Sequence, residues 1–181
     1  NTLVIFTNDN GGEWLSRNAP LFDRKFSLFE GGIRVPAILR WPGHIPAGVT
    51  STQVGITMDL SATAVAISGA KVPADLKLEG INLIPLLQKG AQPVSRTLFW
   101  RVNTAGFNQK AVRQGNWKLM LEAPARAHLF DVVKDPGEHE ELAASHTDIV
   151  QKLRSELLAW EKDVDAEAAS ARPRQPVPER K

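Results

Sequence analysis

The sequence predicts an α/β fold that ends in a small antiparallel four-stranded sheet packed by a C-terminal helix. Three patterns predict this fold. A short apolar run at residues 3–6 precedes turn-forming Asn, Asp and Gly residues, which is typical of a strand buried on both faces of a sheet. Four short strand-like runs follow one another between residues 97 and 132. After Thr147, apolar residues recur at spacings of three and four, which indicates an amphipathic helix.

The composition is that of an ordinary globular protein. The chain has 181 residues, of which 43% are hydrophobic and 23% are charged, enough for a domain with a real core. The net charge is only +2 and the basic residues are scattered, so nothing indicates nucleic-acid binding. No segment approaches the roughly 20 apolar residues of a membrane span. There are no cysteines, which excludes disulfides but does not identify a compartment.

The polar residues after the first strand suggest a cation site. Asp9 and Asn10 offer a carboxylate and an amide oxygen, hard ligands that suit Ca²⁺ or Mg²⁺. Gly11 and Gly12 allow the chain to turn, and only then can both side chains face one ion. Asn, Asp and Gly are also the commonest turn residues, so a plain strand-to-loop turn is the alternative interpretation.

The segment after this turn reads as a loop followed by a glycine-rich turn. Lys25 is a compact cation that suits an oxyanion such as sulfate, although most lysines are solvated surface side chains. The run Glu30-Gly31-Gly32 predicts either positive φ or the close approach of another segment. Arg34 lies four residues after Glu30 and is a candidate partner for its carboxylate.

Strand and helix signals continue through the next fifty residues. Residues 35–41 read as a second strand and residues 54–56 as a short one. Thr57 is expected to cap a helix that has Asp59 in its first turn and ends at Gly69. The residues expected to turn this helix toward the sheet are Leu60, Ala64 and Ile67. Beyond the helix we expect a loop with a short helix up to residue 87, and a domain boundary at residues 88–95.

The last third of the chain predicts the antiparallel sheet and its cover. The expected strands are 97–102, 110–113, 117–121 and 127–132. Gly115-Asn116 between two of them indicates a tight hairpin. We expect one face of this sheet to be exposed and the other to be covered by the final helix. The apolar stripe of that helix is Val150, Leu153, Leu157, Trp160 and Val164.

Several short motifs follow one another between residues 6 and 43. They are Phe6-Thr7-Asn8-Asp9-Asn10-Gly11-Gly12, Asn18-Ala19-Pro20-Leu21, Lys25, Glu30-Gly31-Gly32-Ile33-Arg34-Val35-Pro36 and Trp41-Pro42-Gly43. In this order the chain resembles the C-terminal part of a type I sulfatase, an arylsulfatase-like member of the alkaline phosphatase superfamily. Residues 129–138 also resemble the family's Leu-Tyr-Asp-Leu-x-x-Asp-Pro-x-Glu segment, with Phe130 in place of tyrosine. Ala62 replaces the proline of the family's Asp-x-x-Pro-Thr helix start.

The resemblance implies a fold, a site and a class of substrate. The fold is the C-terminal part of an alkaline phosphatase-like sandwich. Asp9 and Asn10 would be ligands of a divalent cation, most often Ca²⁺ with Mg²⁺ as the alternative, and Lys25 would bind the sulfate group. Glu30 and Arg34 fall in a signature whose role is mainly structural. The substrate would be a sulfated small molecule or glycan, and exported enzymes are typical of the family.

The family's nucleophile is not encoded in these residues. The resemblance implies a formylglycine made from Cys or Ser in a Cys/Ser-x-Pro-x-Arg segment, but no cysteine is present and no serine begins that pattern. We therefore expect a fragment that is inactive alone. The expected division is 1–90 for half of the catalytic domain, 91–165 for the sheet and helix subdomain, and 166–181 for a disordered tail.

Two alternative functions stay open at this point. A phosphonate or phosphate ester hydrolase of the same superfamily would share the metal scaffold, because the discriminating nucleophile lies outside these residues. A non-catalytic binding module built from the sheet and last helix is the second alternative. Substrate-pocket walls could come from Glu13, Trp14 and residues 103–107. Asp131, Asp135 and Glu138 favour turn roles over a second metal loop, because their spacing is not that of an EF-hand.

Overall fold

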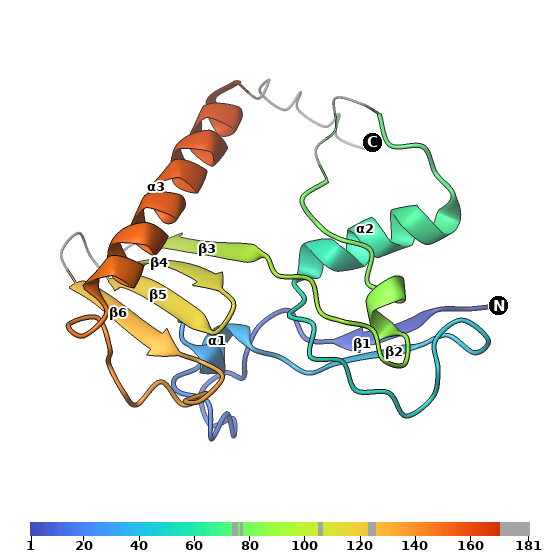
Figure 1. The fold of residues 1–181 in the computed structure, drawn as a ribbon, viewed down its shortest axis with the longest axis horizontal. Coiled ribbons are helices and arrows are strands. Elements are labelled where there is room, and N and C mark those ends of the chain that lie inside the picture. Colours follow the sequence, from blue (N-terminus) through green and yellow to red (C-terminus); the bar gives the residue numbers. More distant parts are fainter. Residues whose placement is uncertain (74–75, 77, 105–106, 123–125, 171–181) are drawn as a thin grey trace, which may run out of the picture.

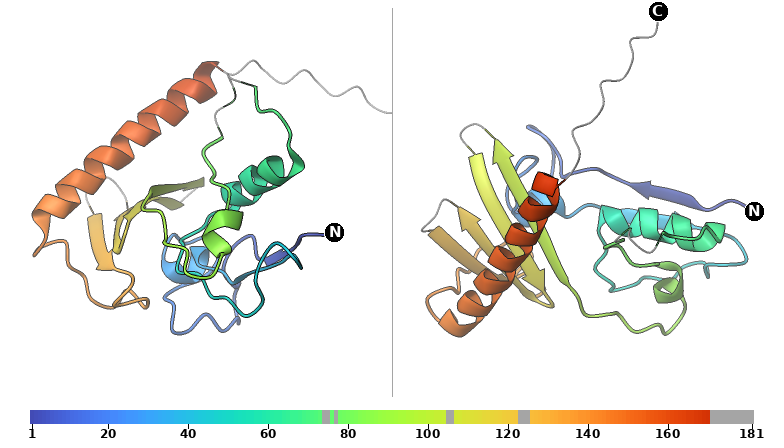
Figure 2. Two further views of the ribbon diagram at one scale, coloured as in Figure 1. Left: turned by 45° about the vertical axis from the view of Figure 1, so that its right-hand side comes forward. Right: turned by 90° about the horizontal axis from the view of Figure 1, so that it is seen from above.

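The computed structural model describes residues 1–73, 76, 78–104, 107–122 and 126–170, and it arranges them around two sheets (Figure 1). One sheet has the strand order β1-β2 and the other has the order β3-β4-β5-β6. Helix α2 lies beside the first sheet and helix α3 crosses the second (Figure 2). The predicted α/β class, with a four-stranded antiparallel sheet packed by a C-terminal helix, is confirmed.

The first sheet is a short antiparallel pair. Strand β1, Val4–Thr7, pairs with β2, Ala37–Arg40, in a register that places Phe6 opposite Ile38. The prediction of a strand buried on both faces is wrong for the described residues, since Phe6 is 57% exposed and Ile38 is 61% exposed. Within the described residues β1 has only one neighbouring strand, and only alternate residues such as Ile5 reach intermediate burial.

Helix α2, Thr57–Ser68, begins and ends near its predicted bounds but buries a different face. Gly69 ends it in the left-handed conformation with φ of 70°, and Ile56, not Thr57, is the capping residue. Of the residues expected to face the sheet, Leu60 is half-buried, but the prediction is wrong for Ala64 and Ile67, which are exposed. The buried residues are Asp59, Ala62 and Thr63. The strand predicted at residues 54–56 does not form, since these residues belong to neither of the two sheets that the structure describes.

Hydrogen bonds explain why polar residues form the buried face of α2. Asp59 accepts from the N–H of Ile56 at 2.8 Å and from the N–H of Ile81 at 2.9 Å. Thr63 Oγ1 accepts from the N–H of Leu83 at 2.9 Å. The segment leading to the 3-10 helix η1, Ile84–Leu87, is thereby fastened along this face, and the short helix predicted before residue 87 is confirmed.

The second sheet has the predicted strands in slightly longer form. The strands are β3, Thr97–Thr104; β4, Phe107–Gln114; β5, Trp117–Glu122; and β6, Arg126–Asp131. All neighbours are antiparallel, and the β4–β5 connection is the expected two-residue hairpin. Gly115 has φ of 60° in this turn, a conformation that glycine adopts without strain.

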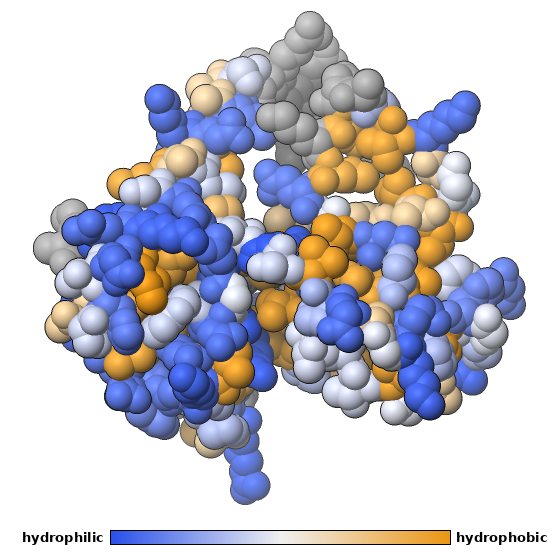
Figure 3. All heavy atoms as spheres, in the orientation of Figure 1, coloured by the Kyte–Doolittle hydropathy of each residue, from blue (hydrophilic) through white to orange (hydrophobic). Residues whose placement is uncertain are grey.

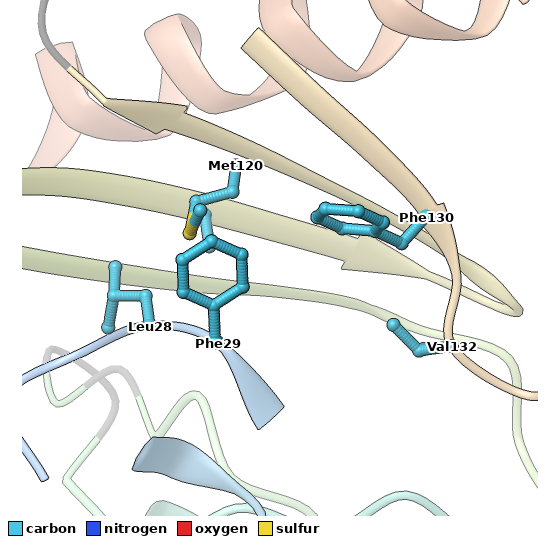
Figure 4. Close-up of a cluster of buried hydrophobic side chains, with 6 residues drawn as sticks. Leu28, Phe29, Met120, Phe130 and Val132 are labelled. Atoms are coloured by element: carbon cyan, nitrogen blue, oxygen red, sulfur yellow. The ribbon is translucent and has the colours of Figure 1, made fainter. Parts of the chain in front are cut away.

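Both faces of the second sheet are covered, so the expected exposed face is wrong. One face buries Val112, Leu119 and Leu129 against the last helix. The opposite face buries Ala111, Met120 and Phe130 under Leu28 and Phe29, which come from the segment before α1, Glu30–Ile33 (Figure 4). The segment that covers this second face lies some eighty residues before the sheet in the sequence. A hydrogen bond joins the two, in which the N–H of Leu28 donates to Gln109 Oε1 at 2.8 Å.

Helix α3, Thr147–Ser170, packs its predicted stripe on the sheet. Leu153 and Leu157 are fully buried and Trp160 stacks on Phe99 at a ring distance of 5.1 Å. The helix continues past residue 165, so the prediction of a disordered tail is wrong for residues 166–170. The remainder of that predicted tail, residues 171–181, lies outside the described residues.

The surface of the two halves differs in character (Figure 3). Apolar side chains gather over α2 and the segment after it, where Met58 is 45% exposed and Leu78 is 40% exposed. The surface around α3 is mainly hydrophilic in the same view. Among the described residues, none of the helices combines the length and the apolar character that crossing a bilayer requires.

Candidate active-site turn

The turn after β1 carries Asp9 and Asn10 at the edge of a cavity of about 310 Å³. Asp9 is exposed and Asn10 is half-buried. The lining of the cavity also includes Glu30, Arg34 and Arg113, so acidic and basic groups share its wall. The polar residues of the turn therefore lie at the end of the strand and border a hollow of a size that suits a small ligand group.

Three glycines lock the turn onto α1. The N–H of Gly11 donates to the carbonyl oxygen of Gly32 at 2.8 Å. A Cβ on Gly11 would overlap the carbonyl oxygen of Gly31, and a Cβ on Gly31 would overlap the carbonyl oxygens of Phe22 and Asp23. The close approach predicted for Glu30-Gly31-Gly32 is thus confirmed, because any side chain at these positions would push the segments apart.

Asn18 and Lys25 hold the other side of the turn. Asn18 Oδ1 accepts from the N–H of Gly12 at 3.2 Å, and its Nδ2 donates to the Gly12 carbonyl at 3.2 Å. The N–H of Lys25 donates to the same carbonyl at 3.0 Å. The main chain of Lys25 is therefore fastened to the residue that follows the Asp9-Asn10-Gly11 run.

The side chain of Lys25 is paired with the expected pocket-wall residue Glu13. Its Nζ lies 3.5 Å from Glu13 Oε2, and the two side chains are 37% and 53% exposed. Next to this pair, Trp14 is 65% exposed and the guanidinium of Arg24 lies 4.1 Å from the centre of its ring. Of the other expected wall segment, Asn103 and Thr104 end β3, and residues 105–106 lie outside the described residues.

The donor set at the turn fits a hard divalent cation but offers only part of its coordination. Asp9 supplies a carboxylate and Asn10 an amide oxygen, the ligand types that Ca²⁺ and Mg²⁺ prefer. No group of three or more Asp, Glu or His side chains converges on a metal position in the part of the chain that the structure describes. Since Ca²⁺ takes six to eight oxygens, these two residues alone would leave most of its coordination to other groups.

A buried ion cluster lies behind the turn, and most of it is not apparent from the sequence. The Glu30–Arg34 pair is confirmed, with Arg34 Nη1 at 3.7 Å from Glu30 Oε2. Lys118 Nζ lies 2.9 Å from Glu30 Oε1 and 2.9 Å from Glu138 Oε1. Arg113 Nη1 lies 4.0 Å from Glu30 Oε2. Lys118 and Glu30 are buried, so these charges can persist only as partners of one another.

Burial shifts two pKa values in this cluster. Desolvation raises the pKa of the Glu138 carboxyl above its ordinary value, and the nearby Lys118 ammonium offsets this only in part. Burial also lowers the pKa of the Arg113 guanidinium, against the opposing attraction of Glu30. One signal in the sequence points to Lys118, namely that it is the one charged residue in the otherwise apolar run from Trp117 to Leu121.

Several polar residues outside this cluster take local roles. His44 stacks on Trp41 at a ring distance of 3.8 Å in an exposed loop. Asp131 Oδ1 accepts from the N–H of Val133 and Lys134, and Asp135 Oδ2 accepts from the N–H of Glu140. The carboxylates of Asp131 and Asp135 therefore each close a turn, in agreement with the roles that the sequence favours, whereas the Glu138 carboxylate pairs with Lys118 in the buried cluster instead.

Comparison with known proteins places this architecture beside sulfatases. A family model described as N-sulphoglucosamine sulphohydrolase, C-terminal, matches residues 18–163. N-acetylgalactosamine-6-sulfatase of Mus musculus is 40% identical over 127 residues, which are 67% of this chain and 24% of that protein. Arylsulfatase A of Homo sapiens is 32% identical over 186 residues, covering 84% of this chain and 36% of that protein. The chain spans about a quarter to about a third of the curated relatives it matches.

Solved structures share the same backbone arrangement. The crystal structure of Ps i-CgsB superimposes with a TM-score of 0.81 at 31% identity, covering 88% of this chain and 36% of that one. The same protein has also been solved in complex with k-i-k-neocarrahexaose. The phosphonate monoester hydrolase of Agrobacterium radiobacter superimposes with a TM-score of 0.65 at 24% identity, covering 89% of this chain and 35% of that one. The latter likeness concerns the fold alone.

Proposed function

The chain belongs to the sulfatase family, to whose C-terminal region residues 18–163 correspond, and from this we propose that it is the C-terminal part of a sulfuric ester hydrolase. The observation that supports this most strongly is the family-model match over residues 18–163. The matched range includes Lys25 and the segment 30–36, whose Gly32 carbonyl accepts a hydrogen bond from Gly11 in the turn after Asp9 and Asn10. The fold is that of the C-terminal part of the alkaline phosphatase-like sulfatases.

In this proposal Asp9 and Asn10 hold a divalent cation, Ca²⁺ before Mg²⁺. The cation supplies Lewis acidity toward the sulfate oxygens when it is bound. The protein's own contribution is to hold two oxygen ligands at the wall of the cavity beyond β1, where the hydrogen bond from Gly11 to Gly32 keeps the shape of the turn. Further ligands and a formylglycine nucleophile would come from polypeptide outside these residues, so we propose that the chain alone is inactive.

Lys25 binds the sulfate group in this proposal by exchanging its partner. Its present partner Glu13 is 53% exposed and lies 3.5 Å away, which makes the pair a weak one. An incoming sulfate ester would offer Lys25 three oxygens that share a negative charge, held beside a bound cation, and because the present pair is weak, leaving Glu13 would cost little. Glu13 would then be released to contact the rest of the substrate.

The substrate class that we propose is a sulfated sugar or another sulfated small molecule. Its support is the family membership together with the relatives of similar sequence, among which N-acetylgalactosamine-6-sulfatase is 40% identical. A phosphonate or phosphate ester is the second candidate, because the phosphonate monoester hydrolase has the same fold. The pocket residues described here do not discriminate between a sulfate and a phosphonate group, since both are tetrahedral oxyanions.

A paired assay tests the proposal. The full-length enzyme that contains these residues is assayed with para-nitrophenyl sulfate and with a phenyl phosphonate ester, alongside Asp9→Asn and the control Asp163→Asn. We expect sulfate ester turnover that falls by about 10²-fold or more in Asp9→Asn and is unchanged in Asp163→Asn, an exposed residue of α3. The 181-residue chain alone should show no turnover above its Asp9→Ala variant. Faster phosphonate than sulfate cleavage would move the assignment to the second candidate.

A further inference from the structure

Three charged side chains from distant segments meet in the interior, and the proposed chemistry uses none of them. Lys118 comes from β5, Glu30 from the start of α1, and Glu138 from the loop after β6. Lys118 Nζ lies 2.9 Å from an oxygen of each carboxylate. Their residues are 0%, 2% and 6% exposed, so this is a core feature and not a surface ion pair.

The cluster holds both the main chain and the side chain of Glu30, the first residue of α1. The N–H of Glu30 donates to Glu138 Oε2 at 2.6 Å, while Lys118 Nζ donates to Glu30 Oε1 at 2.9 Å. A buried charge that loses its partner carries a large desolvation penalty. If Lys118 moved away, the Glu138 carboxylate would lose the cation at 2.9 Å, and Glu30 would keep only its longer contacts to Arg34 and Arg113. Glu30 is therefore held at two points, on its main chain and on its side chain.

Helix α1 passes this restraint on to the turn that carries Asp9 and Asn10. The carbonyl oxygen of Gly32 accepts from the N–H of Gly11 at 2.8 Å. Gly11 also packs against the Gly31 carbonyl so closely that no Cβ fits between them. The contacts thus form one continuous path from Lys118 through Glu30, Gly31 and Gly32 to Gly11.

We propose that Lys118 is a positioning residue: from the second sheet it fixes Glu30, and through α1 it fixes the turn of Asp9 and Asn10. The second sheet then serves as a rigid support for the site on the first, beyond its role in packing. The consequence for cation binding rests on the proposed function, whereas the coupling of Lys118 to Gly11 does not.

Amide hydrogen exchange of the 181-residue chain tests the coupling directly. Lys118→Met keeps an unbranched side chain that is one atom shorter and removes its charge, and Lys134→Met is the matched control because Lys134 is 83% exposed. We expect exchange at the Gly11 amide to accelerate by about tenfold or more relative to the Val112 amide in Lys118→Met, with no change in the control. Unchanged relative exchange at Gly11 in a folded Lys118→Met chain would overturn the proposal.

The wild-type chain decides the question if Lys118→Met does not fold. In native-state exchange at increasing urea, we expect the Gly11 and Lys118 amides to open in one cooperative unit with the same urea dependence. Exchange of Gly11 through urea-independent local fluctuations, while Lys118 stays protected, would contradict the coupling.

A calorimetric titration of the full-length enzyme with Ca²⁺ alone separates this proposal from the proposed function, because the remaining cation ligands are proposed to lie outside these residues. We expect the Ca²⁺ affinity of the wild-type enzyme to fall by about tenfold or more in Lys118→Met. If exchange at Gly11 depends on Lys118 but no Ca²⁺ binds, the proposed cation site is contradicted while the coupling of Lys118 to Gly11 is supported. Ca²⁺ binding that is equal in both enzymes would overturn the positioning role for the site.

Discussion

Two lysines of this chain are held in opposite ways. The side chain of Lys25 is 37% exposed and has one ion pair at 3.5 Å with an exposed carboxylate, a contact worth about 0–1 kcal/mol. Lys118 is fully buried with two carboxylate oxygens at 2.9 Å, so removing its partners would strand a charge in the core. Lys25 is therefore free to change partner, as a substrate contact must, whereas Lys118 is suited only to holding structure.

The Lys25→Ala variant of the full-length enzyme tests the first of these roles. We expect turnover of an aryl sulfate to fall by about 10²-fold or more, because a cation beside the transferred group is lost. The free energy of unfolding should change by less than about 1 kcal/mol. Activity assays and thermal melts measure both. Lys152→Ala, which removes another exposed lysine with a carboxylate at 4.0 Å, is the control and should change neither. A large drop in Tm with normal turnover would make Lys25 a structural residue.

The raised pKa of Glu138 predicts a specific pH dependence of stability. The folded chain binds the proton of this carboxyl more tightly than the unfolded chain does, because burial disfavours the charged form. The stability that this proton contributes is fully present below the ordinary pKa of 4.5 and is lost as the pH rises through the higher folded pKa.

We therefore expect the Glu138→Gln variant to lack this decline. The difference in unfolding free energy, wild type minus variant, should fall as the pH rises from about 4.5 toward neutrality. Urea denaturation at several pH values measures it, with Glu140→Gln as an exposed control whose difference stays flat. A difference that grows with pH would mean that Lys118 lowers the Glu138 pKa more than burial raises it.

At the scale of the elements, helix α2 is attached to its neighbours mainly by hydrogen bonds to buried polar side chains. The apolar side chains Met58 and Ile67 are exposed, yet Asp59 and Thr63 are fully buried. Asp59 caps the helix at Ile56, holds the loop at Ile81, and accepts two contacts at 2.8 Å from Arg96 Nη1 just before β3. One carboxylate thus joins the helix, the loop that covers it, and the start of the second sheet.

Asp59→Ala should accordingly be among the most damaging substitutions in this half of the chain. We expect it to lower the free energy of unfolding by about 3–5 kcal/mol, because Arg96 loses its partner in a site where it is only 14% exposed. Asp148→Ala is the matched control, an exposed acid in the first turn of α3, and should cost less than about 1 kcal/mol. Equal losses in the two variants, measured by urea denaturation, would show that Asp59 acts only through the helix dipole.

In the whole molecule, two small sheets are joined by charged contacts as much as by apolar packing. Leu28 and Phe29 cover one face of the second sheet, and the Glu30–Lys118–Glu138 cluster sits beside that contact. Asp59 and Arg96 make a second link between the halves. The first sheet has few apolar contacts of its own, since Phe6 and Ile38 are exposed, so its shape depends on these links.

The features that the sequence by itself determined are those that depend on residues close together in the chain. The short strands, the Gly115-Asn116 hairpin, the Gly69 helix end and the stripe of α3 all follow from residue type and spacing within a few positions. The order of motifs from Phe6 to Gly43 also sufficed to predict the family, which the match over residues 18–163 confirms. The roles of Asp9, Asn10 and Lys25 stay predictions.

What only the tertiary structure decided depends on segments far apart in the chain. Lys118 looks like a solvent-facing strand residue until Leu28, Phe29 and Glu30 close over that face from some eighty positions away. The buried face of α2 likewise depends on partners at Ile81, Leu83 and Arg96, which no helical period reveals. Burial and ion pairing are set by which surfaces meet, and a one-dimensional pattern records only which residues could tolerate being buried.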